Sequence, residues 1–230
     1  MKPFYRNKLI ASGLFAGLLA SLSPSGSRAG DTIFVVNGNA DTIGAYTTAG
    51  ATVNAALIGP SGLIGPVGIA VSGSDLFVAN ETDGTIGAYT TSGATVNAAL
   101  ISGLSGPFGI ALSGSDLFVA NEIAGTIGEY TTSGATVNAA LISGLSSPFG
   151  IALSGSDLFV TNPLAGTIGE YTTSGATVNA ALISGLNLPQ GIAIGASVIP
   201  EASTWVMALT GFAALAFVGF RRARCGAVSA

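Results

Sequence analysis

Catalysis in this chain would have to rely on carboxylates, because its central part lacks the usual partners of a nucleophile. Residues 30–199 include ten Asp and Glu residues but no His, Lys, Arg or Cys. Serine hydroxyls there would have no His or Lys base. Glu129 and Glu170 occupy matching positions of a repeated segment, which makes them the candidate pair for general acid–base catalysis. The competing interpretation, which we favour, is that they are solvated carboxylates on strands.

Calcium binding is a second chemistry that carboxylates allow. Asp75, Asp116 and Asp157 each close a Ser-Gly-Ser-Asp turn. Hard cations prefer oxygen ligands, so these residues are weak Ca²⁺ candidates. The structural alternative is that each carboxylate accepts hydrogen bonds from turn amides. Because one carboxylate per turn is too few for a good site, we expect no bound metal and no other cofactor.

The charge distribution excludes one class of partner. All seven Lys and Arg residues lie near the chain ends, so residues 30–199 carry negative charges only. Such a body repels phosphate backbones, and nucleic-acid binding is therefore not expected. Cations and neutral polar partners such as sugars are the compatible ligands.

The carboxylates belong to a repeated unit, which is the strongest pattern in the sequence. DLFVAN begins at Asp75 and at Asp116, and DLFVTN begins at Asp157, a spacing of 41 residues. TIFVVN at Thr32 is an earlier copy, offset by 43 residues because the link IGPSGLIGP is longer. A fixed period of this length is typical of repeat architectures.

Each unit predicts four short strands joined by tight links. Its segments read PFGIALSGS, DLFVAN, TIGEYTTSG and ATVNAALISGL, which are rich in β-branched and aromatic residues and bounded by Gly, Ser and Asn. Links this short favour an antiparallel meander over a parallel solenoid. We therefore expect an all-β fold, a small β-propeller of about four four-stranded blades spanning residues 30–196.

The two ends of this repeat region complement each other. Residues 32–37 form a second-strand segment with no first strand before it, and residues 189–194 form a lone first-strand segment. Joined, the two would complete a fourth blade and close the ring without an exposed inner edge. An open array of sheets is the alternative.

The repeated strands resemble the NHL-type propeller repeat. In that family a Pro-x-Gly-Ile-Ala strand precedes a Leu-aromatic-Val-Ala strand, and residues 107–111 (PFGIA) and 117–120 (LFVA) match it. The resemblance covers residues 32–194 and implies a propeller architecture. Asn80, Asn121 and Asn162 stand where the family usually has Asp, and the family's Arg on the third strand is absent. The resemblance therefore implies no particular partner.

The loop after the second strand is where the units differ most. It reads GNAD, ETDG, EIAG and PLAG in successive units, whereas the strands are nearly copies of one another. Loops on a rigid scaffold commonly carry binding residues, although exposed loops also vary by drift. The candidate binding residues are Asn39, Asp41, Glu81, Asp83, Glu122 and Pro163.

The last strand of each unit, residues 135–142 in one copy, is expected at the outer edge of its blade. This segment carries no charge, and its polar residues are Thr and Asn only. Edge strands are usually guarded by Lys, Pro or bulges. We therefore predict a tendency to lateral self-association.

The sequences of both chain ends are typical of an exported protein. Residues 1–29 combine a basic start, an apolar stretch and small residues, as in a signal peptide cleaved after Ala29. Residues 204–220 are uncharged and long enough for a short transmembrane helix. Arg221, Arg222 and Arg224 follow, and the positive-inside bias places them in the cytoplasm. The body would then face the outer side of the inner membrane.

Residues 197–230 resemble a PEP-CTERM sorting signal. That family has a Pro-Glu-Pro motif, a hydrophobic segment and an Arg cluster, and here Pro200, Glu201 and Ala202 form the motif, with Ala in place of the second Pro. The resemblance implies a Gram-negative bacterium, an exosortase in the inner membrane that removes the tail, and release toward the cell surface. Proteins of this family are associated with exopolysaccharide and biofilm matrix.

These patterns predict an exported, non-enzymatic surface or biofilm-matrix protein. One alternative is a carbohydrate- or protein-binding propeller module that uses the variable loops. Another is a secreted propeller hydrolase or lyase, which the near-identity of the units argues against, since catalysis needs one unit to differ from the others.

Overall fold

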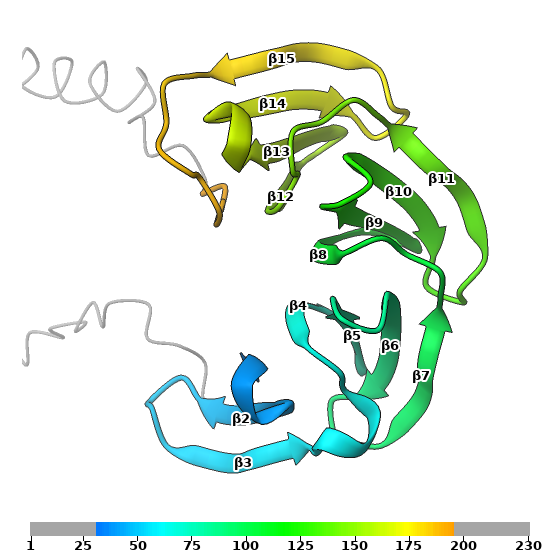
Figure 1. Cartoon of the computed structure of the whole chain (residues 1–230). Coiled ribbons are helices and arrows are strands. Elements are labelled where there is room, and N and C mark those ends of the chain that lie inside the picture. Colours follow the sequence, from blue (N-terminus) through cyan, green and yellow to red (C-terminus); the bar gives the residue numbers. More distant parts are fainter. Residues whose placement is uncertain (1–30, 196–230) are drawn as a thin grey trace, which may run out of the picture. The chain divides into compact units, whose positions relative to one another are not determined.

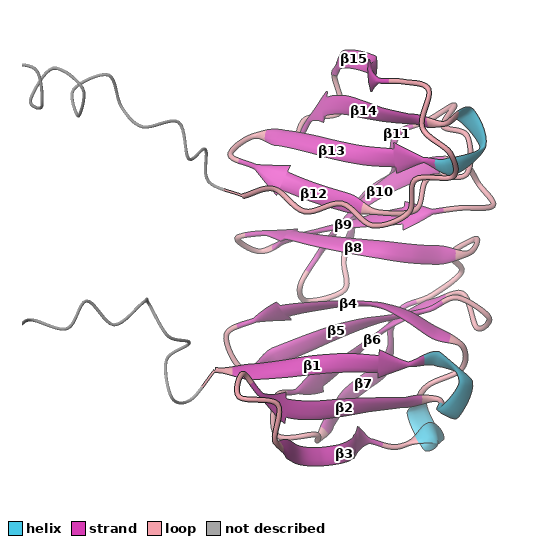
Figure 2. Cartoon of the chain, turned by 90° about the vertical axis from the view of Figure 1, so that its left-hand side faces the viewer, coloured by secondary structure: helices cyan, strands magenta, loops and turns pink. Residues whose placement is uncertain are grey.

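A computed structural model describes residues 31–195, which fold into antiparallel sheets joined by short links (Figure 1). The chain divides between Leu100 and Ile101 into two compact units. Each unit contains two sheets, and successive strands of a sheet run in opposite directions (Figure 2). In the described part of the chain, no helix has the length and apolar character needed to cross a membrane.

The first unit contains sheets A and B. Sheet A has three strands, β1 (Thr32–Asn37), β2 (Thr42–Thr47) and β3 (Thr52–Ile58). Sheet B has four strands, β4 (Pro66–Ser72), β5 (Asp75–Asn80), β6 (Thr85–Thr90) and β7 (Thr95–Ile101). Two single-turn 3₁₀ helices, η1 (Gly38–Ala40) and η2 (Pro60–Gly62), lie in the links.

The second unit repeats this plan in sheets C and D, which have four strands each. Sheet C consists of β8 (Pro107–Ser113), β9 (Asp116–Asn121), β10 (Thr126–Thr131) and β11 (Thr136–Ile142). Sheet D consists of β12 (Ile151–Ser154), β13 (Asp157–Asn162), β14 (Thr167–Thr172) and β15 (Thr177–Ile183). A third 3₁₀ turn, η3 (Pro163–Ala165), follows β13.

The meander follows from the turn chemistry of the repeat. In each Ser-Gly-Ser-Asp link the glycine has a positive φ, 57° at Gly73 and 60° at Gly114, which other residues rarely adopt. Ser72 and Asp75 are consequently paired across the first hairpin of sheet B. The four-strand order predicted from the sequence is confirmed in sheets B, C and D, and the last strand lies at the edge of each sheet.

Each unit buries its core between the facing sides of its two sheets. In the first unit Phe34 and Ile43 of sheet A pack against Leu76, Val78 and Tyr89 of sheet B. In the second unit the core contains these residues: Phe118, Ile127 and Ile142 of sheet C with Leu158, Val160 and Tyr171 of sheet D. Alternate residues of a strand point to opposite faces, so every second apolar residue of these strands reaches the core.

One expectation differs from the structure. Residues 189–194 are not a strand, and sheet A has three strands rather than four. A strand requires backbone hydrogen bonds to a neighbouring strand, and within the described part of the chain no strand pairs with residues 189–194. The blade expected from joining these residues to β1 is therefore not formed, and ring closure stays a prediction.

Candidate functional site

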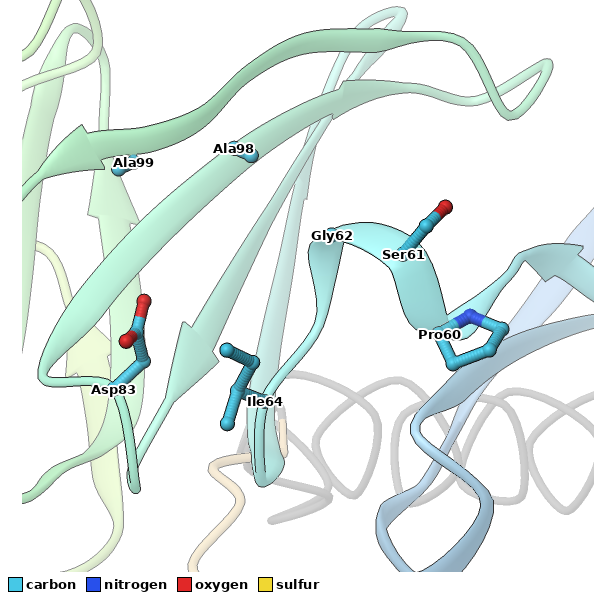
Figure 3. A pocket seen from close by; sticks show the side chains of 7 residues that line it. All are labelled: Pro60, Ser61, Gly62, Ile64, Asp83, Ala98 and Ala99. Atoms are coloured by element: carbon cyan, nitrogen blue, oxygen red, sulfur yellow. The ribbon is translucent and has the colours of Figure 1, made fainter.

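A pocket of about 430 Å³ in the first unit is the candidate binding site (Figure 3). It lies beside the link that joins β3 to β4 and the loop that joins β5 to β6. Its lining residues are Pro60, Ser61, Gly62, Ile64, Asp83, Ala98 and Ala99. Ligand pockets are commonly concave and largely apolar with a few polar groups, and this lining fits that description.

The pocket forms where the sequence departs from its own repeat. The link carries two extra residues, and Pro60 and Ser61 lie in η2, which forms there. Ile64 stands where the next unit has Ser105, and Asp83 stands where the other units have Ala40, Ala124 and Ala165. Three independent departures thus converge on one cavity.

Hydrogen bonds fix the backbone on one side of the pocket. The Tyr89 hydroxyl, which projects from β6, donates to the carbonyl oxygen of Gly62. The Glu81 amide donates to the Gly65 carbonyl oxygen at 2.9 Å, and the Gly65 amide donates to Asp41 Oδ1 at 3.1 Å. The link is therefore tied to its own sheet and to the preceding loop, which gives the pocket a defined wall.

Asp83 supplies the only charge in the pocket lining. Its Oδ2 accepts a hydrogen bond from the Thr85 hydroxyl at 3.5 Å. Figure 3 shows its carboxylate on the same side of the pocket as Ile64, below Ala98 and Ala99 of β7. A carboxylate beside small apolar side chains can accept hydrogen bonds from a hydroxylated ligand, and charge-assisted bonds of this kind are the stronger ones.

The other variable-loop candidates lie in different loops, and the carboxylates among them accept hydrogen bonds from residues of the fold rather than lining a common pocket. Asp41 has a φ of 48° and caps the Gly65 amide. Glu122 accepts a hydrogen bond from the Ser147 hydroxyl. Asn39 and Pro163 lie in η1 and η3 of different sheets, and Glu81 accepts a hydrogen bond from Thr82 at 3.3 Å.

The calcium candidates remain apart. Asp75, Asp116 and Asp157 begin the second strands of sheets B, C and D. Within residues 31–195, no three His, Cys, Asp or Glu side chains come close enough to share a metal ion. Asp116 accepts a hydrogen bond from the neighbouring Ser115 hydroxyl at 3.4 Å, which is a contact within its own turn.

The candidate catalytic pair is distributed over two sheets. Glu129 lies on β10, opposite Phe118 and Asn138, and Glu170 lies on β14, opposite Phe159 and Asn179. Burial raises the pKa of the Glu129 carboxyl above its ordinary value of 4.5, and the negative charge of Asp116 raises it further. The cross-strand neighbours of both glutamates are Phe and Asn, whose side chains are not ionisable and cannot act as an acid or a base.

Sequence reasoning found Asp83 but missed the rest of the lining. Ala98 and Ala99 belong to a strand that is copied in every unit, so nothing in their local sequence marks them. The signal that was present is the two-residue extension of the link, which places Pro60 and Ser61 beside β7. An insertion in one copy of a repeat is therefore the better pointer to the site.

Solved structures share this fold. A streptogramin B lyase structure matches with a TM-score of 0.59 and 22% identity, over 72% of this chain and 56% of that chain. A selenomethionine-substituted virginiamycin B lyase from Staphylococcus aureus matches with a TM-score of 0.58 and 25% identity, over 71% of this chain and 56% of that chain. Both are propeller-like, and the likeness shows that this chain is an all-β protein of the β-propeller type.

The chain spans 56% of the length of these two lyase structures. A third match is a virginiamycin B lyase variant bound to quinupristin, described as catalytically inactive after a His-to-Ala substitution, at 21% identity and a TM-score of 0.50. No protein-family model matches the sequence, and no curated protein sequence matches it.

Several predicted features lie outside the described residues. These are the signal peptide of residues 1–29 with its cleavage after Ala29, the sorting tail of residues 197–230 and the helix of residues 204–220. The tail includes the motif Pro200, Glu201 and Ala202 and the arginines Arg221, Arg222 and Arg224.

Proposed function

We propose that the chain is an exported, non-enzymatic surface or biofilm-matrix protein with a four-sheet propeller-type body. The observation that carries the proposal is the order of the C-terminal sequence. Pro200 and Glu201 precede an uncharged stretch, and Arg221 and Arg222 follow it, as in an exosortase sorting signal. The arginine-free body and the basic tail fit a protein whose body is exported while its arginines stay in the cytoplasm.

The direct test is the mass of the extracellular protein. We expect mass spectrometry of material released by the producing cells to detect the repeat region and no peptide beyond the motif at Pro200. Replacement of Glu201 by Ala should leave the tail attached and the protein in the membrane fraction. An extracellular form that retains Arg221 and Arg222 would contradict the proposal.

A second candidate function is carbohydrate binding at the pocket of the first unit, and one observation favours it. Asp83, Ile64 and the residues of η2 all depart from the repeat, and all of them line this pocket. Pro60 and Ile64 offer apolar surface to a sugar ring, while the Asp83 carboxylate accepts from its hydroxyl groups. The exported protein would then hold a neutral exopolysaccharide.

Glycan-array binding by the full chain tests this second function. Asp83→Ala, which introduces the residue of the other units, should weaken binding at least roughly tenfold, because a hydrogen bond to a charged group contributes about 1.5–3 kcal/mol. Asp75→Ala, at an exposed turn of the same sheet, is the matched control and should leave binding unchanged. Equal binding by both variants would exclude the pocket.

A lyase activity is the third candidate, supported only by the names of the structural neighbours. A third neighbour, a virginiamycin B lyase, is described as catalytically inactive after a His-to-Ala substitution, whereas this chain has no histidine. The chain would therefore need a different base, and Glu129, whose pKa is raised by burial, is the one to test. Turnover of a streptogramin B that Glu129→Gln abolishes would establish this activity.

A further inference from the structure

Sheet D has an apolar face that the described chain leaves exposed. The last strand of every sheet ends with an isoleucine, and Ile58, Ile101 and Ile142 are 4%, 5% and 4% exposed. Ile183, the equivalent residue of sheet D, is 46% exposed. Phe159 on the same face is half-buried, whereas its equivalents in sheets B and C are buried.

Sheet A also has an exposed apolar face, and it is equivalent to the face that sheet D buries against sheet C. Ile33 and Val35 of β1 are 45% and 37% exposed. Their equivalents in sheet D are Leu158 and Val160, which are fully buried. Within the described part of the first unit, no sheet packs on this face of sheet A, whereas sheet C covers the equivalent face of sheet D in the second unit.

These two exposed faces are the halves of an interface that the second unit already contains. There, one face of sheet C packs against one face of sheet D. On the exposed face of sheet D, the repeat places Phe159, Ile168 and Ile183 at the positions that Phe118, Ile127 and Ile142 occupy in sheet C. On the exposed face of sheet A, it places Ile33, Val35 and Tyr46 at the positions of Leu158, Val160 and Tyr171, which form the face of sheet D that contacts sheet C. The exposed face of sheet D is thus complementary to the exposed face of sheet A.

A pocket marks the space that a partner would fill. About 370 Å³ is open over sheet D, and its lining is Ser154, Phe159, Ile168, Leu182, Ile183, Ile192, Ala193 and Ile194. Side chains such as Ile33 and Val35 suit this largely apolar lining, because exposed apolar surface of this kind is stabilised by burial.

Residues 189–194 are held where a first strand belongs. The chain enters this segment at Leu188 with a φ of 49°, just as it enters β8 at Gly106 with a φ of 63°. The Gln190 carbonyl oxygen would lie 2.3 Å from a Cβ at Gly150, and the Phe149 carbonyl oxygen would lie 2.3 Å from a Cβ at Gly109. The segment therefore contacts sheet D as β12 contacts sheet C. Among the described residues, no second strand pairs with it.

We propose that sheet D of one copy docks on sheet A of a second copy, with residues 189–194 adding to the free edge of β1 as its missing first strand. The register follows from sheet D, where Ile151 pairs with Val160. By the repeat, Ile192 pairs with Val35 and Ile194 pairs with Ile33 of the partner. Backbone hydrogen bonds along this edge give the contact its direction.

Two copies are the expected assembly. The interface joins unlike surfaces and each copy offers one face of each kind, so two copies are the smallest symmetric assembly in which both faces of each copy are covered.

Engineered disulfides between separately prepared chains test the junction. The full chain carrying Cys225→Ser, which removes its only cysteine, is made as Val35→Cys and as Ile192→Cys, and the two proteins are mixed in detergent under mild oxidation. We expect a species of two linked chains that contains one of each variant. Val53→Cys mixed with Ile192→Cys is the matched control, because Val53 is an exposed valine on β3 of the same sheet.

A second pair guards against a folding defect in one variant. Ile33→Cys mixed with Ile194→Cys should link in the same way, since these residues are the next pair in register with the same spacing. Linkage no greater than in the control for both pairs would overturn the proposal. So would a doubly substituted Val35→Cys, Ile192→Cys chain that closes on itself while mixed single variants stay unlinked, because the strand would then be supplied within one chain.

The mass of the protein in solution provides an independent measurement. Light scattering should give the mass of two chains for the unmodified protein and of one chain for Val35→Lys, whose charge would be buried in the junction. Val53→Lys should keep the mass of two chains. A mass of one chain for the unmodified protein at all concentrations would overturn the proposal.

Discussion

The ring of Tyr130 lies over Gly128, two residues earlier on the same strand. A Cβ atom at Gly128 would lie 2.6 Å from both Cε2 and Oη of Tyr130. The same relationship recurs between Gly87 and Tyr89 and between Gly169 and Tyr171. The Thr-Ile-Gly-x-Tyr pattern of each unit therefore has a packing cause: the glycine leaves room for a buried aromatic ring.

Gly128→Ala should consequently destabilise the second unit. Placing a methyl group against the Tyr130 ring forces the ring or the strand to move, and overpacking of this kind costs about 1–3 kcal/mol in the free energy of unfolding. Gly59→Ala is the control, because the backbone there is extended with a φ of −86° and no atom lies within 4 Å of the added Cβ. Urea denaturation of both variants measures the difference, and equal losses would show that the ring does not require the glycine.

Much of the fold could be predicted because its information is local. The Ser-Gly-Ser-Asp links carry a glycine with positive φ, and they place Ser72 opposite Asp75 in the hairpin. Alternating apolar residues in segments such as DLFVAN then decide which face is buried. Strand order within a sheet follows from these two facts, since consecutive tight hairpins can only build a meander.

The remaining features depend on contacts between distant parts of the chain. The sequence of residues 189–194 predicts a first strand, yet they form none, because within residues 31–195 no second strand pairs with them. The pocket at Asp83 needs η2, a turn about twenty residues earlier, and the copied alanines of β7. The sequence identified Asp83 as one of six variable-loop candidates. Only the structure shows that Asp83 lines the pocket, whereas the Asp41 carboxylate accepts a hydrogen bond from the Gly65 amide.

Substitutions at Asp41 should separate backbone conformation from hydrogen bonding. Asp41 has a φ of 48°, where the other units have glycine, and its Oδ1 accepts from the Gly65 amide at 3.1 Å. Asp41→Ala should lower the free energy of unfolding by about 1–3 kcal/mol, because it leaves a donor unpaired and places Ala in a left-handed conformation. Asp41→Gly relieves the second cause and should lose less, while Asp41→Asn should stay close to the unmodified protein. Thermal unfolding monitored by circular dichroism ranks the three, and an Ala variant as stable as the Asn variant would contradict both causes.

The buried tyrosines predict a loss of stability at alkaline pH. Burial raises the pKa of the Tyr130 phenol above its ordinary value of 10.0, and the nearby Asn121 side chain partly opposes this rise. The folded state therefore holds the proton more tightly than the unfolded state. Its contribution to stability is complete below about pH 10 and is lost as the pH rises through the folded-state pKa. Tyr130→Phe should make the free energy of unfolding fall less steeply above pH 10, and an unchanged slope in denaturant titrations would contradict the shift.

Leu188 should be a site where glycine stabilises the protein. Its φ of 49° lies in the left-handed region, where the equivalent residues Gly65 and Gly106 have φ values of 62° and 63°. That conformation costs a non-glycine residue roughly 1–2 kcal/mol, and the greater freedom of glycine in the unfolded chain offsets about 0.5–1 kcal/mol of this. Leu188→Gly should therefore raise the free energy of unfolding by about 0.5–1 kcal/mol in urea titrations. Ser147→Gly, at the equivalent position before β12, should gain less, because the Ser147 hydroxyl donates a hydrogen bond to the Glu122 carboxylate that glycine cannot replace. A lower urea midpoint for Leu188→Gly would show that residues 189–194 are not held in the conformation of a first strand.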